Sequence, residues 1–147
     1  MKTGIVTSRV VFNASVIFSA YYSLTGASHA LFDLLQQKRI IGIVSETILD
    51  ELLRHAHKIP MDTELLRRSI DKNFIIIVSA PSEKNVAFYK KFVQDEGDAH
   101  LFATSIETHA DYLVSLDKHH VLALKGKLKG IAILSPAALL MLLQKPQ

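Results

Sequence analysis

Four oxygen-bearing side chains, spread widely along the chain, are candidates to hold a metal ion. They are Asn13, Glu51, Asp98 and Asp117. Carboxylate and amide oxygens are the ligands that hard cations such as Mg2+ and Mn2+ prefer, and such ions commonly act on phosphate esters. If the fold brings these side chains together, the cluster would indicate chemistry on a phosphodiester.

The hydrophobic pattern predicts alternating strands and helices that would position these residues. The predicted strands are Arg9–Phe12, Ile40–Val44, Phe74–Val78, Asp111–Leu116 and Ile131–Leu134. The predicted helices cover Ser15–Tyr22, a segment after Gly26 up to Lys38, a segment opened by Ser45, Thr63–Lys72, Ser82–Val93, a segment opened by Asp98, and Ser135–Leu143. Asn13 and Asp117 therefore each follow a strand, and Glu51 lies on a helix.

Two of these helices carry further expectations about their faces. In Thr63–Lys72, the spacing predicts that Leu65, Leu66 and Ile70 face inward. In Ser82–Val93, apolar residues alternate with lysines, which predicts a helix with a solvated basic side.

This alternation is typical of an α/β protein, a three-layer sandwich with a mainly parallel central sheet flanked by helices. Parallel neighbours need crossover connections, which are usually helices. Ligands of such sheets bind beyond the carboxyl ends of the strands. Since no linker, repeat or low-complexity tract divides the sequence, we expect residues 1–147 to form a single domain with one cleft.

The composition limits the classes of function. The chain has 147 residues, of which 49% are hydrophobic and 21% charged, as in a globular protein with a substantial core. The absence of cysteine excludes disulfides, thiolate zinc sites and a cysteine nucleophile. A formal charge of +3 would tolerate a polyanion but does not argue for one.

The amino-terminal segment has some features of a secretion signal, with Lys2 and Arg9 before an apolar stretch from Val10 to Tyr22. Polar residues such as Asn13 interrupt that stretch, and its removal would take away the first predicted strand. No other segment approaches the roughly 20 apolar residues of a membrane span. We therefore expect a cytoplasmic protein that makes no membrane contact.

Four stretches of the chain together resemble the PIN domain nucleases. They are RVVFNASVIFSA, IVSETILDELLRH, QDEGDAHLFATSIETHADYLVSLDKHHVLAL and IAILSPAALL. In that family an Asp ends the first strand, usually within Asp-Thr-Asn, and is followed by a Glu on a helix, an Asp at the head of a later helix, and often a fourth Asp after a strand. The run ADYLVSLDK, preceded by a helix starting DAHLFA, is the most specific piece.

The resemblance implies a Mg2+- or Mn2+-dependent endoribonuclease. Asp98 and Asp117 would be metal ligands, Glu51 a ligand or a group that orients water, and Ser115 a hydroxyl near the site. Lys118, Arg54 and Lys90 are further candidates, as contacts to RNA phosphates. The likeness to toxin-like PIN proteins also implies an antitoxin protein as partner, and a homodimer.

One departure from the family pattern concerns the site itself. Asn13 stands where the family has its first Asp, and Ala14 and Ser15 replace the usual Thr and Asn. An amide offers a carbonyl oxygen to a cation but no negative charge. Losing that charge would cost roughly 2 to 4 kcal/mol, a factor of tens to several hundreds in affinity. Weak metal binding is the expectation.

Other interpretations of the sequence stay open at this point. The first is a PIN-like module without catalysis that binds RNA or a protein, and the second is a phosphoacceptor signalling domain, which the neutral end of the first strand disfavours. Asn13 and Ser15 could simply cap a helix, and single acids are often solvated or turn residues.

The seven histidines raise the question of zinc, but the spacing of the pairs His55–His57 and His119–His120 does not put both side chains on one helical face. His100 is expected at the surface. The lysines at 125, 127 and 129 read as a solvated loop without aromatic partners to stack bases.

Overall fold

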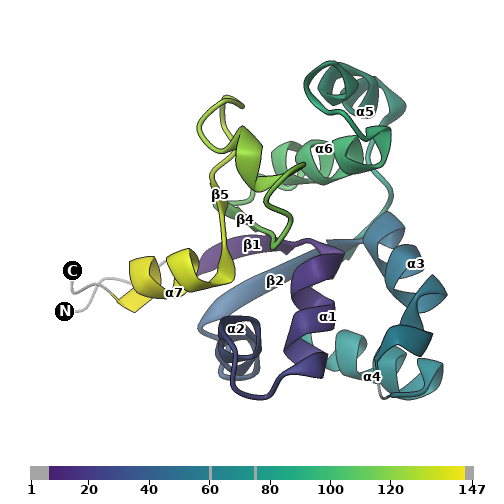
Figure 1. Ribbon diagram of the computed structural model, residues 1–147, viewed down its shortest axis with the longest axis vertical. Helices are drawn as coiled ribbons and strands as arrows, with labels where there is room; N and C mark the ends of the chain where they lie inside the picture. Colours follow the sequence, from purple (N-terminus) through teal and green to yellow (C-terminus); the bar gives the residue numbers. More distant parts are fainter. Residues whose placement is uncertain (1–6, 60, 75, 145–147) are drawn as a thin grey trace.

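Five short parallel strands form the centre of the protein (Figure 1). The computed structural model describes residues 7–59, 61–74 and 76–144. The strands are β1 (Ser8–Phe12), β2 (Ile40–Ser45), β3 (Ile76–Val78), β4 (Tyr112–Val114) and β5 (Ile133–Leu134), in the order β3-β2-β1-β4-β5. Because β1 pairs with β2 on one side and β4 on the other, the ends of these three strands lie next to each other.

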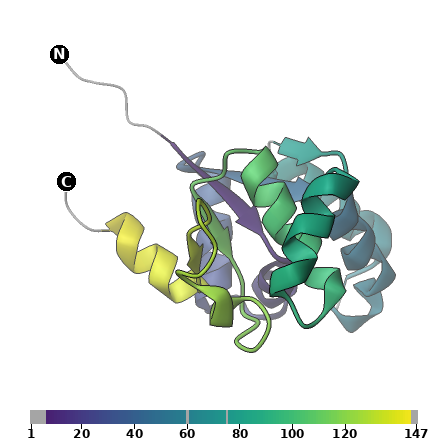
Figure 2. The same ribbon diagram turned by 90° about the horizontal axis from the view of Figure 1, so that it is seen from above.

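Helices cover both faces of this sheet (Figures 1 and 2). They are α1 (Ala14–Tyr22), α2 (Ala27–Gln36), α3 (Glu46–Arg54), α4 (Thr63–Asn73), α5 (Glu83–Tyr89), α6 (Ala99–Glu107) and α7 (Pro136–Gln144), with 3-10 turns η1 (Ala56–Lys58), η2 (Lys90–Phe92), η3 (Glu96–Asp98) and η4 (Leu122–Leu124). In Figure 1, α5 and α6 lie on one side of the sheet and α1, α2 and α4 on the other. The predicted three-layer α/β architecture is confirmed.

Three helices are capped by the serines with which their predicted segments begin. The Ser45 hydroxyl accepts a hydrogen bond from the Ile48 amide at 3.1 Å, and Ser135 accepts one from the Ala138 amide at 3.1 Å. Ser82 caps α5 in the same way. Each hydroxyl satisfies an amide that the first turn of a helix leaves unpaired.

A cluster of three aromatic side chains fills the layer between the sheet and α2. Phe12, Phe32 and Phe74 pack edge to face, with ring centroids 5.3 to 5.9 Å apart. Gly42 in β2 makes room for them, because a Cβ there would lie 2.6 Å from the Phe74 ring. Truncating a buried phenylalanine such as Phe12 costs about 3–5 kcal/mol, so this group holds the end of β1 in place.

Some predicted faces and boundaries were wrong. Leu65 is 51% exposed although it was expected inside, since Leu66 and Ile70, four residues apart, share the buried face and Leu65 is turned about 100° away. The predicted helix Ser82–Val93 ends at Tyr89 and tightens into η2.

Three strands are also shorter than predicted: β3, β4 and β5. The predicted strand Phe74–Val78 includes residue 75, which is outside the described residues. Within the described ranges, no helix has both the length and the apolar character that a membrane crossing requires.

Candidate metal centre

The turn after β1 and the loop after β4 are joined by hydrogen bonds. The backbone amide of Asn13 donates a hydrogen bond to the Val114 carbonyl at 3.0 Å, which extends the pairing of β1 and β4 by one residue. The Asn13 side chain then donates from Nδ2 to the Ser115 Oγ at 2.8 Å. Asn13 occupies the N-cap position of α1, but its side chain makes no capping bond. The interpretation of Asn13 as a side-chain cap is therefore wrong.

Ser115 connects this turn to Asp117. Its hydroxyl is fully buried and accepts a second hydrogen bond, from the Asp117 amide at 3.0 Å. A hydroxyl oxygen has two acceptor positions, so both are occupied. Ser15, in the first turn of α1, likewise accepts a bond from the Leu116 amide at 3.1 Å. The loop that carries Asp117 is thus fastened to the start of α1.

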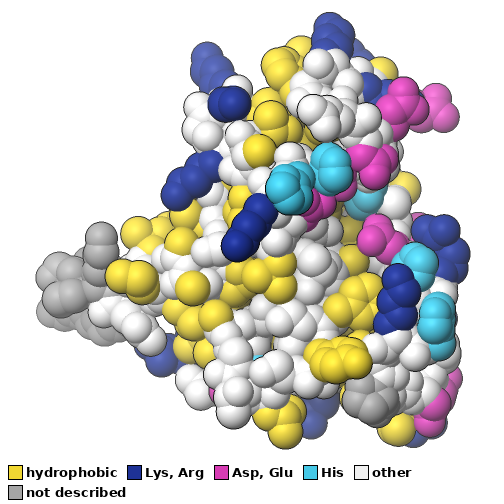
Figure 3. All heavy atoms as spheres, in the orientation of Figure 1, with side chains coloured by type: hydrophobic (Ala, Val, Ile, Leu, Met, Phe, Trp, Pro, Cys, Tyr) yellow, Lys and Arg dark blue, Asp and Glu magenta, His cyan; other side chains and the backbone are white. Residues whose placement is uncertain are grey.

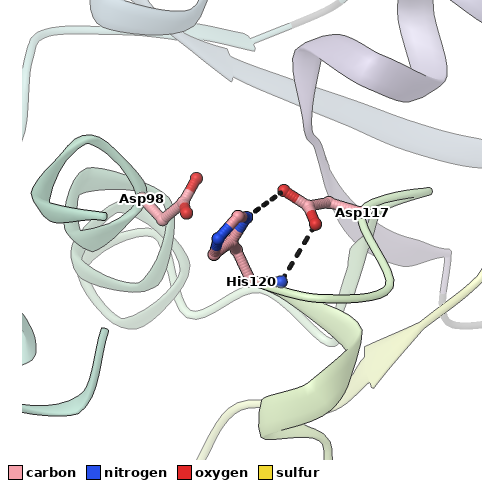
Figure 4. Close-up of side chains that lie close together, drawn as sticks. All are labelled: Asp98, Asp117 and His120. Atoms are coloured by element: carbon pink, nitrogen blue, oxygen red, sulfur yellow. Dashed lines mark hydrogen bonds and ion pairs between the residues drawn. The ribbon is translucent and has the colours of Figure 1, made fainter. Parts of the chain in front are cut away.

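Asp117 is held in a fixed orientation by the turn that follows it. Its Oδ1 accepts hydrogen bonds from the amides of His119 at 3.1 Å and His120 at 2.9 Å. Its Oδ2 lies 3.4 Å from Nδ1 of the His120 ring (Figure 4). These contacts fix the orientation of the Asp117 carboxylate.

Asp98 points toward the same place from the start of α6 (Figure 4). One ligand atom from each of Asp98, Asp117 and His120 lies within 4.8 Å of the others, and we call these three residues the Asp–His cluster. The Oδ2 atom of Asp98 is buried and has no hydrogen-bond partner among the residues that the structure describes. An unpaired buried carboxylate oxygen is costly unless something else binds it.

The electrostatics of the cluster act against ionisation of Asp98. Burial, followed by the negative charges of Asp95, Asp117 and Glu51, raises the pKa of this carboxyl to about 6, and His120 opposes the rise. A bound cation would reverse this effect by favouring the charged carboxylate. The unpaired oxygen, the two converging carboxylates and the adjacent imidazole therefore fit a divalent cation.

The four residues expected to form the site are not placed equally. Asp98 and Asp117 lie together in the cluster. Glu51, half-buried on α3, is outside this group, although its charge is close enough to act on Asp98. Asn13 is connected to Asp117 through Ser115.

Two histidines differ from the sequence-based expectation. His120 was set aside because it was judged by helical spacing, but it lies in a turn where an Asp-x-x-His spacing brings its ring back to Asp117. That spacing, in DKHH, was the available signal. His100 is only partly exposed: its Nδ1 is buried without a partner in the described part of the chain, and burial lowers its pKa.

The basic residues predicted to contact RNA phosphates are available at the surface. Lys118, Arg54 and Lys90 are all exposed. The Lys90 Nζ is 4.0 Å from Glu96, an exposed contact of little energetic weight. Figure 3 shows histidine, acidic and basic side chains gathered on one part of this face.

Comparison with known proteins agrees with this architecture. A family model described as a PIN domain matches residues 9–119, and the chain belongs to the PIN domain family. A similar fold is found in a chain of the crystal structure of VapBC2 from Rickettsia felis bound to a DNA fragment from their promoter, with a TM-score of 0.61 and 16% identity. That match covers 86% of this chain and 98% of the other. No protein with a curated description matches this chain.

Proposed function

We propose that this PIN domain protein is a Mg2+- or Mn2+-dependent endoribonuclease with a weakened metal site. The observation that carries the proposal is the buried, unpartnered Oδ2 of Asp98 facing the fixed carboxylate of Asp117. Membership of the PIN domain family supports a nuclease of this type.

In the proposed reaction, the residues of the chain hold and orient the reactants. A bound divalent cation would polarise a phosphodiester oxygen and lower the pKa of a water molecule. Asp98 and Asp117 would hold that cation, and the amides of His119 and His120 would keep Asp117 oriented. Glu51, beside the cluster, would orient the attacking water.

The weakness of the site follows from Asn13. Its side chain is neutral, and Nδ2 is committed to Ser115, so it contributes at most one carbonyl oxygen. This feature favours a second candidate function, a PIN domain without catalysis that binds RNA or a protein. The two candidates differ in whether the natural chain cleaves RNA.

The test is cleavage of mixed single-stranded RNA in the presence of Mg2+ or Mn2+ by the natural chain, Asn13→Asp and Asp98→Ala. We expect slow cleavage by the natural chain, faster cleavage by Asn13→Asp and none by Asp98→Ala. Activity that survives in Asp98→Ala would reject the proposed site.

If the natural chain does not cleave RNA and Asn13→Asp does, the second candidate function is favoured. Calorimetric Mn2+ titration of the three proteins gives a readout besides activity, and Asn13→Asp should bind tens of times more tightly.

We also propose that the protein acts as the toxin of a toxin–antitoxin pair. This part rests on the resemblance to toxin-like PIN proteins and on the fold shared with a chain of VapBC2. Exposed apolar side chains, among them Leu24 and Met141, would be available to an antitoxin or to a second copy in a homodimer. Light scattering of the purified chain, alone and after co-expression with its neighbouring genes, tests both assemblies.

A further inference from the structure

A hollow of about 190 Å3 lies directly beside the Asp–His cluster. One wall comes from the segment after α5 and includes Phe92. The other comes from the connection between β4 and β5 and includes His119, His120 and Lys127. We call this the Phe92 hollow. His120 belongs to both the hollow and the cluster. A ligand in the hollow would therefore lie next to any ion bound by the cluster.

The aromatic wall of the hollow is both exposed and anchored. Phe92 is 44% exposed and packs beside Phe88, which is 49% exposed, so the two rings form an accessible aromatic patch rather than an isolated apolar side chain. The Phe92 ring lies 5.6 Å from the Phe88 ring and 6.4 Å from the Tyr89 ring, measured between centroids. Tyr89 is buried and packs against Phe102 of α6 at 6.0 Å. Phe92 is therefore an accessible aromatic group supported by a row of rings rooted in the core.

The opposite wall of the hollow carries a cation, Lys127, that can contact an anionic group. Lys127 is exposed on the wall shared with His119, and Lys90 and Lys91 extend from η2 next to Phe92. Figure 3 shows basic, acidic and apolar side chains around the histidines on this face. The sequence-based view of Lys127 as a loop residue without an aromatic partner is thus corrected, because Phe92 lines the same hollow.

We propose that the Phe92 hollow is a nucleotide subsite, in which one unpaired base of single-stranded RNA stacks on Phe92 while Lys127 contacts a flanking phosphate. Aromatic side chains beside cations are the usual platform for single-stranded nucleic acid, because every base has a face that can stack. The volume is below that of pockets for drug-sized ligands and suits a single ring system. The inference rests on the proposed function, since the subsite would deliver the neighbouring phosphodiester to the Asp–His cluster.

The test measures binding of a short fluorescein-labelled oligouridylate by anisotropy, in EDTA, so that no cleavage can interfere. Phe92→Ala should weaken binding about tenfold, and Phe92→Tyr should bind like the natural chain. Phe92→Leu, which keeps apolar bulk and guards against a folding artefact, should bind as poorly as Phe92→Ala. Lys127→Gln should reduce the slope of log affinity against log salt by about 0.7.

Matched controls separate the hollow from the rest of the surface. Tyr22→Ala removes an aromatic side chain that is 70% exposed on α1, and Lys129→Gln removes an exposed lysine of the same connection as Lys127. Neither should change binding. The proposal is overturned if Phe92→Ala costs less than about threefold, if Phe92→Leu binds normally, or if Tyr22→Ala gives an equal loss.

Failure of this inference can be told apart from failure of the proposed function. If the chain cleaves RNA but its RNA affinity does not depend on Phe92, the subsite is rejected and the proposed nuclease function stands. If RNA affinity depends on Phe92 but neither the natural chain nor Asn13→Asp cleaves RNA, the subsite is supported and the proposed nuclease function is rejected. A natural chain that binds no oligonucleotide would overturn the subsite and favour a protein segment as the occupant of the hollow.

Discussion

Replacing Asp98 with asparagine should stabilise the metal-free protein while abolishing cation binding. The pKa of Asp98 is raised from 3.8 to about 6, first by burial and then by the charges of Asp95, Asp117 and Glu51. A carboxyl group whose pKa is higher in the folded than in the unfolded state binds its proton more tightly when folded, so its ionisation opposes folding. The penalty is fully present above about pH 6 and disappears as the pH falls toward 4.

The size of this effect follows from the difference in proton affinity. A tenfold difference corresponds to about 1.4 kcal/mol, so the rise from 3.8 to about 6 corresponds to about 3 kcal/mol. Because Asp98 is only half-buried, solvent screening reduces this to about 1.5 kcal/mol. For 147 residues the entropy of unfolding is about 0.3 kcal/mol per kelvin, which predicts a rise in Tm of about 5 °C near neutral pH.

Thermal unfolding followed by circular dichroism in EDTA measures this difference. About a third of the Tm difference between Asp98→Asn and the natural chain should remain near pH 4.5, where the folded Asp98 carboxyl is protonated. Asp71→Asn, which removes an exposed acid from α4, is the matched control and should leave Tm unchanged. Added Mn2+ should raise Tm for the natural chain and not for Asp98→Asn. A lower Tm in Asp98→Asn, or a difference that does not change with pH, would refute the reasoning.

Three further predictions concern the site and the sheet that supports it. Mn2+ affinity of the natural chain, measured by calorimetry, should fall about tenfold from pH 7 to pH 5, because protons compete for Asp98; a flat profile would exclude Asp98 as a ligand. Ser115→Ala should lower the free energy of unfolding in urea by about 1–3 kcal/mol, because it leaves a buried amide donor unpaired, and an unchanged midpoint would contradict the role given to this hydroxyl. Gly42→Ala should destabilise the protein by about 1–3 kcal/mol through overlap with Phe74, again in urea; a neutral result would mean that the ring can move aside.

The parts of the fold that the sequence predicted well are those marked by local signals. Ser45, Ser82 and Ser135 each begin a helix by accepting a hydrogen bond from the first turn, which needs no knowledge of the tertiary structure. The end of α5 depends instead on distant packing, since Tyr89 is buried against Phe102. A pattern read along one helix cannot contain that contact, and so Phe92 was assigned to a helix that had already ended.

The site was predictable to the extent that it depends on topology. Asp117 was expected just after a strand of a parallel sheet and Asp98 at the head of a helix, and the fold brings the two carboxylates together. His120 was missed because its position depends on a turn rather than on helical periodicity. The hollow beside it could not be predicted either, because Phe92 and Lys127 belong to separate segments that meet only in three dimensions.

The buried hydroxyl between the first and fourth strands is compatible with either an amide or a carboxylate at position 13. With asparagine at position 13 it accepts two hydrogen bonds, but a rotation about its C–O bond would let it donate to a carboxylate in the same place. Ser115 can therefore serve either residue without a change in the backbone. A single substitution at position 13 would therefore introduce a carboxylate into a scaffold that already has a hydrogen-bond donor for it.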